Sequence, residues 1–371
     1  MPKIKIVADD KIPFLKGVLE PYGDVVYLPG AAIAAADVRQ ADALLIRTRT
    51  ACKAELLTGS AIRFIATATI GFDHIDRDYC ARDGIVWTSA PGCNSGSVMQ
   101  YLVSVLLNLA ARHHLTLAGR TLGVVGIGHV GAKVAKAAAV LGMKVLCCDP
   151  PRQRREGNAG FVSLAALQAE ADFVTIHVPL DPDGEPPTRH LVDGDFLRRL
   201  RPGAFLINAS RGEVVDTVAL KAALAAGQLG GAVLDVWENE PDIDLELLRA
   251  VDFGTPHIAG YSADGKANGT SMCVQALSRF FGLGLDCWQV PVVPPPAVAV
   301  LPPTPGLTGE AEIRRAVNHA YDIAEDDRAL RAATGNFEKL RGTYRNRREF
   351  FAFHVNGSPE AETLARLGFL P

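Results

Sequence analysis

A glycine-rich turn near residue 126 constrains the fold more than any other feature of the sequence. The string GVVGIGHVG occupies residues 123–131, and Gly126, Gly128 and Gly131 give it the spacing GxGxxG between an apolar run and a helix-forming stretch. The first glycine permits a tight turn, the second lets the backbone approach a pyrophosphate, and the third lets helix pack on strand. The N-terminus of the following helix adds N–H donors and positive potential. The segment therefore predicts a strand–turn–helix unit that binds a dinucleotide.

The sequence on both sides of this turn alternates short apolar runs with helical patterns, which is typical of an α/β fold with parallel strands. In the N-terminal part, strands are expected at 4–7, 25–28, 43–46, 64–68 and 85–88, with helices or turns at 14–22, 53–59 and 74–83. A long helix is expected at Ser97–Ala111, from its helical spacing of apolar residues. Later strands are expected at 121–125, 144–148, 173–178, 204–208, 231–236 and 252–255, with helices at 129–141, 163–170, 217–226, 244–250 and 265–281. Six such strands with crossover helices predict a complete Rossmann-type, doubly wound sheet.

A change of composition near residue 290 predicts a further, smaller unit. Residues 291–305 contain seven prolines, which favour an extended linker over a helix. Beyond them, the apolar spacing from Ile313 to Ala324 predicts one amphipathic helix, followed by a strand at Phe350–Val355 and a closing helix at Glu360–Leu367. We therefore expect a small α+β segment at the end of the chain.

Composition excludes several classes of protein. The 371 residues are 48% hydrophobic and 21% charged, as in ordinary globular proteins of two or three domains. The net charge of −3 provides no basic field for nucleic acid. No apolar run reaches the roughly 18 residues of a membrane span, and the N-terminus lacks the apolar core of a signal peptide. The seven cysteines are scattered without a CxxC pair, so we expect reduced thiols in a cytoplasm and no metal site.

An acidic residue at the end of the second strand after the turn bears on the choice of dinucleotide. Asp149 lies 23 residues after Gly126, where a carboxylate accepts hydrogen bonds from the adenosine ribose and repels a 2′-phosphate. This position favours NAD over NADP. Arg152 is the opposing observation, since an arginine there accepts the 2′-phosphate of NADP. A helix or turn cap is the structural alternative for Asp149.

Three charged or titratable residues follow the last three strands, at the edge where open α/β sheets bind ligands. These are Arg211 in NASRGEVVD, Glu240 in LDVWENEP and His257 in TPHIAGY. Oxidation of a secondary alcohol needs a base, and histidine has a suitable unperturbed pKa. A neighbouring carboxylate stabilises the protonated imidazole, while an arginine binds a substrate carboxylate. The combination predicts a dehydrogenase acting on a 2-hydroxy acid.

The same strings resemble those of the NAD-dependent D-isomer-specific 2-hydroxyacid dehydrogenases. The resemblance includes GVVGIGHVG, HVPL at 177–180, LINASRGEVVD at 206–216, VLDVWENEP at 233–241 and TPHIAGYS at 255–262. Within that family, the strings IRTRT at 46–50, TATIGFDHID at 67–76 and YRNRREF at 344–350 are similar to those of members that oxidise 4-phospho-D-erythronate. The resemblance covers nearly the whole chain.

The resemblance implies roles for individual residues. Arg211 and Glu240 match the catalytic arginine and glutamate, and His257 matches the proton donor or acceptor. Substrate contacts are implied for Thr48, Thr69 and Tyr261. Cofactor contacts are implied for Gly126, Gly128, His129, Val130, Gly131, Asp149, Val178, Ala209, Ser210, Arg211, Asp235 and Gly260. Val178 stands where relatives often have threonine, so only a backbone contact is expected to persist there.

The resemblance also implies an architecture and a reaction. A flavodoxin-like α/β substrate domain made from residues 1–95 and 258–290 would be interrupted by an NAD-binding domain at 96–257 and followed by a C-terminal dimerisation domain at 291–371. The implied reaction oxidises a small phosphorylated acid, 4-phospho-D-erythronate, in pyridoxal 5′-phosphate biosynthesis. A homodimer with no nucleic-acid or membrane partner is expected.

Two other functions remain open from the sequence. The chain could act on another D-2-hydroxy acid such as 3-phosphoglycerate, which would use the same three residues. It could also sense NAD(H) without catalysis, although Arg211, Glu240 and His257 argue against this. We expect the arginines of the cluster 341–348 on a solvated or interface face, with Arg345, Arg347 and Arg348 at the rim of the dimer interface, and phosphate binding as the less favoured alternative.

Overall fold

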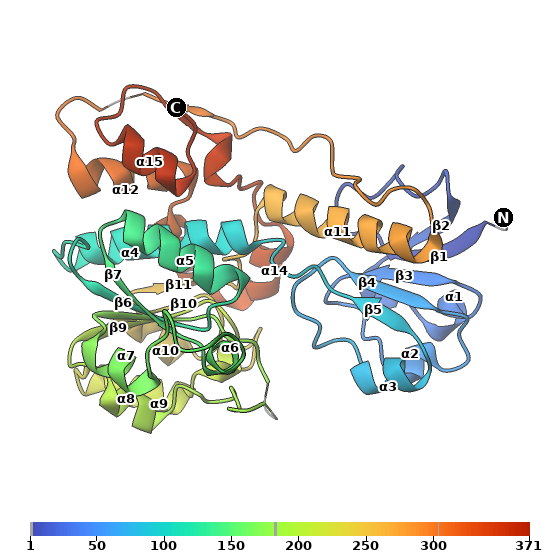
Figure 1. The fold of residues 1–371 in the computed structure, drawn as a ribbon, viewed down its shortest axis with the longest axis horizontal. Coiled ribbons are helices and arrows are strands. Elements are labelled where there is room, and N and C mark those ends of the chain that lie inside the picture. Colours follow the sequence, from blue (N-terminus) through green and yellow to red (C-terminus); the bar gives the residue numbers. More distant parts are fainter. Residues whose placement is uncertain (1–2, 182–183, 303) are drawn as a thin grey trace. The chain divides into compact units, whose positions relative to one another are not determined.

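Two parallel sheets, each built from successive strand–helix units, organise the chain (Figure 1). The structure, a computed structural model, describes residues 3–181, 184–302 and 304–371. The chain divides into two units, and each is made from two separate stretches. Unit 1 comprises Met1–Asn94 and Ser262–Pro294, and unit 2 comprises Ser95–Tyr261 and Pro295–Pro371.

The sheet of unit 1 has the strand order β2-β1-β3-β4-β5, and all its strands are parallel. Its strands are β1 (Ile4–Asp9), β2 (Gly23–Leu28), β3 (Ala43–Ile46), β4 (Phe64–Thr67) and β5 (Val86–Thr88). The short helices are α1 (Ala35–Val38), α2 (Ala54–Leu57) and α3 (Arg77–Arg82), and the long helix α11 (Ala263–Phe281) packs beside β4. This order is the flavodoxin-like one, so the expected fold of this unit is confirmed.

Local sequence explains the ends of these elements. Asp76 accepts a hydrogen bond from the Tyr79 N–H and begins α3, and Ser262 begins α11 in the same way. Residues 14–22 form turns and no helix, because Phe14 and Gly17 have φ angles of +62° and +88°. The left-handed backbone at Phe14 interrupts the helical pattern that its apolar neighbours suggest.

The sheet of unit 2 has the order β11-β10-β9-β8-β6-β7, again with parallel strands. Its strands are β6 (Thr121–Val125), β7 (Lys144–Cys148), β8 (Phe173–Ile176), β9 (Ala204–Asn208), β10 (Leu229–Leu234) and β11 (Phe253–Gly254). In Figure 1, α4 (Ser95–Arg112) and α5 (His129–Val140) lie on one face of this sheet, and the helices α7 (Leu164–Glu170), α8 (Gly194–Arg199), α9 (Thr217–Ala225) and α10 (Leu245–Ala250) lie on the other. The strand order reverses at β6, which is where such sheets bind dinucleotides.

The expected strands of unit 2 are all present, but β8 and β11 are shorter than predicted, and β10 begins and ends two residues earlier than predicted. β8, β10 and β11 end at Ile176, Leu234 and Gly254, and the residues beyond them turn into loops. The helices α6 (Pro150–Glu156) and α8 were not expected from apolar periodicity. Each begins at an aspartate, Asp149 or Asp193, whose carboxylate accepts a backbone N–H of the first turn.

The C-terminal segment, residues 295–371, belongs to unit 2 and contains more helix than expected. Its elements are β12 (Val300–Leu301), α12 (Gly309–Ala320), α13 (Ile323–Ala332), α14 (Phe337–Gly342), β13 (His354–Val355) and α15 (Ala361–Leu367). The prediction of one helix through Ala324 is wrong, because Tyr321 is extended and Asp322 begins α13 by accepting the Ala324 N–H at 2.9 Å. The strand expected from Phe350 is confined to His354 and Val355.

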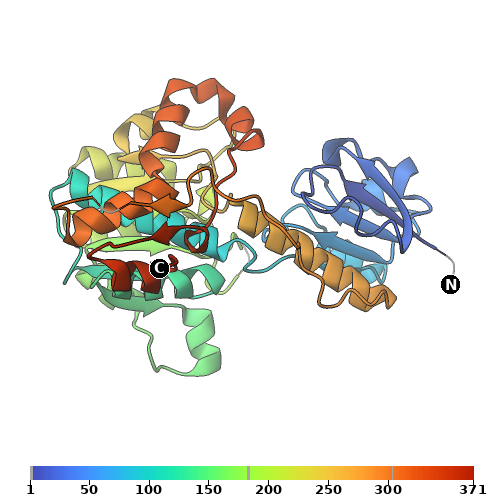
Figure 2. The same ribbon diagram turned by 90° about the horizontal axis from the view of Figure 1, so that it is seen from above.

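The apolar side of the C-terminal segment packs on its own chain. α12 contacts α4 and α15 contacts α5, so the segment forms an outer layer over these helices in both ribbon views (Figures 1 and 2). Tyr321, which is 1% exposed, lies against Tyr101 with ring centroids 5.8 Å apart. Apolar residues of the segment, among them Ile313, Val317, Phe350 and Phe369, belong to the same apolar core as α4. The segment therefore completes the core of unit 2.

Two arginines of this segment lie where they were not expected. Arg347 and Arg348 are 3% and 8% exposed, so the prediction of a solvated rim is wrong for both. Nη2 of Arg347 donates to the carbonyl oxygens of Ser97, 3.1 Å away, and Ala259, 2.5 Å away. The Arg348 carbonyl accepts from Nε2 of Gln100 at 3.0 Å. The two Arg347 bonds satisfy backbone carbonyls near the start of α4 and after His257, which an exposed arginine side chain could not do.

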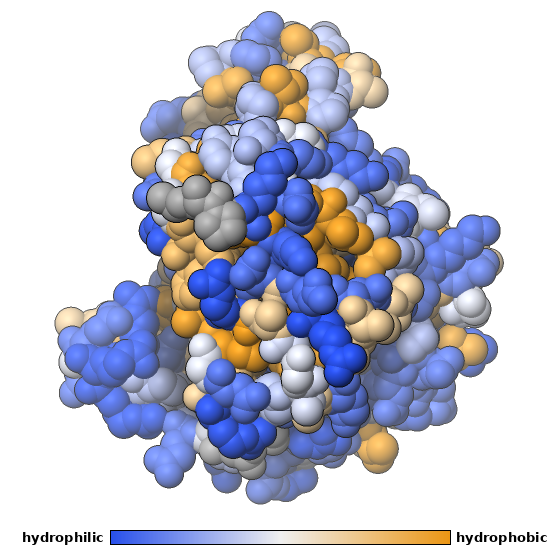
Figure 3. All heavy atoms as spheres, turned by 90° about the vertical axis from the view of Figure 1, so that its right-hand side faces the viewer, coloured by the Kyte–Doolittle hydropathy of each residue, from blue (hydrophilic) through white to orange (hydrophobic). Residues whose placement is uncertain are grey.

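Surface and thiol properties complete the description. Among the described residues, no helix is both long enough and apolar enough to cross a membrane. All seven cysteines are free thiols. Figure 3 faces the side of the ribbon with β1 and β2, and polar residues cover most of it around smaller apolar groups. The prediction of three domains, with the C-terminal segment as a dimerisation domain, stays a prediction.

Candidate active site

The three predicted catalytic residues follow neighbouring strands of the six-stranded sheet. Arg211 lies three residues after β9, Glu240 six after β10 and His257 three after β11. Because β9, β10 and β11 are adjacent and parallel, their carboxyl ends meet at the same edge.

Glu240 and His257 form a direct pair. Oε2 of Glu240 is 2.7 Å from Nδ1 of His257, and its Oε1 accepts the backbone N–H of Trp237 at 2.9 Å. A carboxylate only accepts, so Nδ1 carries the proton and Nε2 remains for a ligand. The side chains of His257 and Glu240 are 29% and 18% exposed, respectively. The imidazole is therefore oriented by a partly buried carboxylate and still reaches solvent.

Opposing effects act on the pKa of Glu240. Burial raises this pKa, but the hydrogen bond and charge of His257, the Trp237 N–H and the charge of Arg341 lower it, and the net pKa is below its ordinary value. The carboxyl group therefore stays ionised at neutral pH and stabilises a protonated His257.

Asp235 holds the loop that contains His257. Its carboxylate, which is 1% exposed, accepts from the Thr255 hydroxyl at 2.6 Å and from the N–H groups of Ile258 and Ala259 at 2.8 and 2.9 Å. The His257 N–H donates to the Asp235 carbonyl at 2.7 Å, and His257 has a φ of +56°. Such a conformation is costly for histidine and persists only when neighbours fix it. Burial raises the pKa of Asp235, against these donors and the charge of His257.

Asn208 shapes the loop that contains Arg211. Its Oδ1 accepts from the N–H and hydroxyl of Ser210 at 3.1 and 2.8 Å, and its Nδ2 donates to the Arg211 carbonyl at 2.9 Å. The following Gly212 lies directly against the backbone of Trp237, where a Cβ would collide. The Arg211 and Glu240 loops are therefore packed together at their backbones.

The glycine-rich turn has the shape that a dinucleotide requires. Gly126 has a φ of +88°, and a Cβ there would lie 2.7 Å from the His177 carbonyl. At Gly131 a Cβ would meet the Gly126 carbonyl, so only glycine lets α5 begin this close to β6. At Gly128 a Cβ would have no atom within 4 Å. That open space, next to the N-terminus of α5, fits a pyrophosphate.

Asp149 lies beside this turn and also begins α6. Its carboxylate accepts from the Ile127 N–H at 2.8 Å and the Arg152 N–H at 2.9 Å. The Arg152 guanidinium donates to Glu156 at 2.7 Å and to the Ile127 carbonyl at 2.6 Å. The structural alternative for Asp149, a helix cap, is therefore present. Because the carboxylate is next to the turn, a role toward the adenosine ribose is compatible with the cap.

Comparison with known proteins identifies the family. Residues 105–259 match the NAD-binding domain of the D-isomer specific 2-hydroxyacid dehydrogenases, and residues 292–368 match a domain of unknown function. An erythronate-4-phosphate dehydrogenase of Bacteroides fragilis is 48% identical over 355 residues, covering 95% of this chain and 99% of that protein. The chain belongs to the erythronate-4-phosphate dehydrogenase family.

Solved structures place this member of the erythronate-4-phosphate dehydrogenase family among related folds. A D-lactate dehydrogenase from Aquifex aeolicus, in complex with NAD and lactic acid, is 27% identical with a TM-score of 0.63. The match covers 76% of this chain and 97% of that one. An NADPH-dependent glyoxylate/hydroxypyruvate reductase from Sinorhizobium meliloti, bound to NADP and malonate, is 28% identical with a TM-score of 0.65, over 76% and 95% of the two chains. The predicted family, enzyme class, fold and NAD cofactor are confirmed.

The other predicted residues of this family member divide between the units. His129 and Val130 begin α5, Val178 follows β8, and Ala209, Ser210 and Gly260 lie in the Arg211 and His257 loops, all in unit 2. Tyr261 ends the His257 loop. Thr48 and Thr69 belong to unit 1 and follow the adjacent strands β3 and β4. The Thr69 hydroxyl contacts the Thr67 hydroxyl at 2.8 Å. The ligand contacts of all these residues stay predictions.

Sequence reasoning missed Asn208 and Trp237, and it named Arg341 only as part of the cluster 341–348, without placing it in the site. Asn208 ends β9, Trp237 supports Glu240, and Arg341 comes from α14, 101 positions after Glu240 in the printed numbering. The string NASRG could have indicated Asn208, since Asn at a strand end often folds the following turn. The arginine cluster 341–348 drew attention to Arg341, but no local pattern placed it near Glu240.

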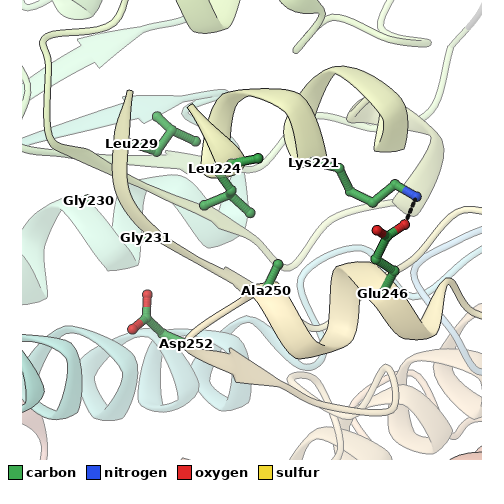
Figure 4. A pocket seen from close by; sticks show the side chains of 9 residues that line it. Lys221, Leu224, Leu229, Gly230, Gly231, Glu246, Ala250 and Asp252 are labelled. Atoms are coloured by element: carbon green, nitrogen blue, oxygen red, sulfur yellow. Dashed lines mark hydrogen bonds and ion pairs between the residues drawn. The ribbon is translucent and has the colours of Figure 1, made fainter. Parts of the chain in front are cut away.

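A separate pocket lies at the end of the six-stranded sheet opposite to the carboxyl ends of its strands, by the start of β10 (Figure 4). Its volume is about 420 Å³, and it is lined by Lys221, Leu224, Ala225, Leu229, Gly230, Gly231, Glu246, Ala250 and Asp252. Lys221 is bound by Asp244 and Glu246, each at 2.8 Å. Because the catalytic residues follow the carboxyl ends of the strands, this pocket is not part of their site.

Proposed function

We propose that the chain oxidises 4-phospho-D-erythronate to (R)-3-hydroxy-2-oxo-4-phosphooxybutanoate with NAD, as a step of pyridoxal 5′-phosphate biosynthesis. The observation that supports this most directly is the Glu240–His257 pair, 2.7 Å apart at the carboxyl edge of an NAD-binding sheet. The substrate is that named for the relative 48% identical over 95% of the chain.

The proposed chemistry assigns one task to each residue. Nε2 of His257 takes the proton of the C2 hydroxyl as the C2–H bond breaks, and Glu240 stabilises the resulting imidazolium. NAD, when bound, accepts the hydride. The Arg211 guanidinium binds the substrate carboxylate next to C2 and fixes which carbon faces the base. Asp235 and Asn208 hold the two loops in the required positions.

Gly126, Gly128 and Gly131 would hold the NAD pyrophosphate, with Asp149 at the adenosine ribose. The carboxylate at the end of β7 supports NAD over NADP. Arg152 is weak support for NADP, because its guanidinium already binds Glu156 and the Ile127 carbonyl.

An absorbance assay of NADH formation tests the proposal. The purified protein is given NAD with 4-phospho-D-erythronate, D-3-phosphoglycerate or D-lactate at equal concentrations. We expect kcat/KM to be highest for 4-phospho-D-erythronate. A clear preference for D-3-phosphoglycerate or D-lactate would favour the other dehydrogenase, and NAD binding without turnover of any acid would favour a sensor.

We also propose that the protein is a cytoplasmic homodimer joined through its C-terminal segment. The seven free thiols support a reducing compartment. Four large apolar side chains of this segment are exposed: Val298, Val300, Phe351 and Leu370, at 55%, 49%, 50% and 40%. A second copy covering these side chains would remove them from water.

Light scattering tests the dimer with surface variants. Deleting residues 291–371 would uncover the core of unit 2, so V300E and F351E are the sharper choices. We expect the wild type to have the mass of a dimer and the double variant that of a folded monomer. A monomeric wild type would contradict the proposal.

A further inference from the structure

Helix α14 brings a cation of the C-terminal segment close to the catalytic pair. Phe337, which is 1% exposed, and Leu340 anchor this helix in the apolar core that also contains Trp237. Trp237 in turn donates its backbone N–H to Glu240. The same helix places Arg341 against Tyr261, at the end of the His257 loop, with Nη2 3.5 Å from the Tyr261 hydroxyl and the guanidinium 5.9 Å from the ring centroid. Its charge also lowers the pKa of Glu240.

The Arg341 guanidinium has unused capacity as a donor. Its Nη1 is 3.3 Å from Oε1 of Glu338, and its Nη2 is 3.5 Å from the Tyr261 hydroxyl, at the limit of a hydrogen bond. Its Nε is buried and has no hydrogen-bond partner among the described residues. The side chain is 19% exposed. A half-buried arginine with long contacts and an unpaired N–H is poorly satisfied without an anion.

The neighbouring arginines of the segment are differently engaged. Arg345 donates to Asp326 at 2.6 Å and lies 3.4 Å from Glu325, so two carboxylates compensate its charge. Nη2 of Arg347 donates to two backbone carbonyls, and the guanidinium lies over the Tyr321 ring, 4.4 Å from its centroid. Its Nε and Nη1 also lack a hydrogen-bond partner among the described residues, but Arg347 is only 3% exposed and is therefore closed to a ligand. Among these three arginines, Arg341 is the one beside Glu240 and Tyr261.

The proposed substrate needs a second cation. It has a carboxylate at one end and a phosphate at the other, and Arg211 accounts for the carboxylate. The D-lactate dehydrogenase, which binds an acid with one charge, matches 76% of this chain, whereas the relative named for a phosphorylated acid matches 95%. Residues 292–368 of this chain match a domain of unknown function, and Arg341 lies within it.

We propose that Arg341, with the Tyr261 hydroxyl, binds the phosphate group of the substrate and makes the enzyme selective for a phosphorylated acid. The proposal rests on the function proposed above. It gives the C-terminal segment a role in recognition. Tyr261 is four residues after His257, so a phosphate held there lies at the side of the site next to the base.

Kinetics with two acids that differ only in the phosphate test the proposal. Wild type, R341Q and R341K are compared on 4-phospho-D-erythronate and on D-erythronate. We expect R341Q to raise KM for the phosphorylated acid about 10- to 100-fold, the usual value of a hydrogen bond to a charged group. We expect kcat/KM for D-erythronate to change less than threefold, and R341K to recover part of the loss. Inorganic phosphate should inhibit R341Q more weakly than the wild type.

K339Q is the matched control, since Lys339 is an exposed cation of the same helix. It should leave both KM values unchanged, and an equal loss in K339Q would overturn the proposal by showing a general effect of charge. Equal losses on both acids in R341Q, with a shifted pH profile, would overturn it by showing that Arg341 acts only through Glu240. A wild type that does not oxidise 4-phospho-D-erythronate would instead contradict the proposed function itself.

Discussion

The loops after β9–β11 and the C-terminal segment both hold charged groups inside unit 2, but they satisfy them differently. In the loops, Asp235 and Glu240 each accept from fixed donors, so those side chains have one arrangement. In the C-terminal segment, Arg341 makes long contacts and keeps an unpaired Nε. The difference separates two tasks: the loops position reacting groups before a substrate arrives, whereas the segment leaves donors for a group that the substrate brings.

The largest expected effect is the loss of turnover when a residue of the loops after β9–β11 is replaced. H257N should lower kcat about 10²- to 10⁴-fold, because it removes the general base while the NAD site stays intact. Turnover is measured by NADH absorbance, and NAD affinity by calorimetry as the control. A near wild-type kcat at neutral pH would contradict the role of His257 and remove the contrast between the two regions.

The next effect is on the stability of the C-terminal segment. Y321A should lower the free energy of unfolding by about 3–5 kcal/mol, since it empties a fully buried site against Tyr101. Denaturant titration measures it, with V218A as the control because that side chain is 73% exposed and lies outside the C-terminal segment. A loss below 1 kcal/mol in Y321A would show that the segment is not part of the core of unit 2.

A smaller effect is expected on the choice between NAD and NADP. D149A should lower the NAD-to-NADP affinity ratio about 10- to 100-fold, by removing both a charged acceptor and a repulsion. E156Q, which releases Arg152 but keeps Asp149, is the comparison, and fluorescence titration with both dinucleotides is the measurement. Equal affinity of the wild type for NAD and NADP would contradict the assignment of Asp149.

The smallest effect is on pH dependence. E240Q should move the acid limb of the kcat/KM profile for oxidation to lower pH, because a neutral amide no longer favours imidazolium. The lowered pKa of Glu240 means that its ion pair stabilises the fold above the ordinary glutamate pKa and is lost as pH falls through the lowered one. An unchanged acid limb in E240Q would contradict the pairing with His257.

The strands, and the positions of the proposed catalytic residues at strand ends, could be predicted because their signals are local. Continuous apolar runs marked the strands, and Arg211, Glu240 and His257 followed directly from strand ends. Helix α6 was missed because Pro150–Glu156 has no apolar face, although Asp149 before two prolines is a typical helix start. Arg341 could not be found this way. Its place beside Glu240 depends on how Phe337 and Leu340 pack in a core formed by residues far away in the sequence.

The division of each unit into two stretches affects how the chain acquires its structure during synthesis. The core around α4 includes Tyr321, Phe350 and Leu367, so it stays incomplete when residue 261 leaves the ribosome. At about 5–20 residues per second, the remaining 110 residues take roughly 5 to 20 seconds. During that interval the apolar outer faces of α4 and α5 are open to water, which makes this stage the one at which a chaperone would matter most.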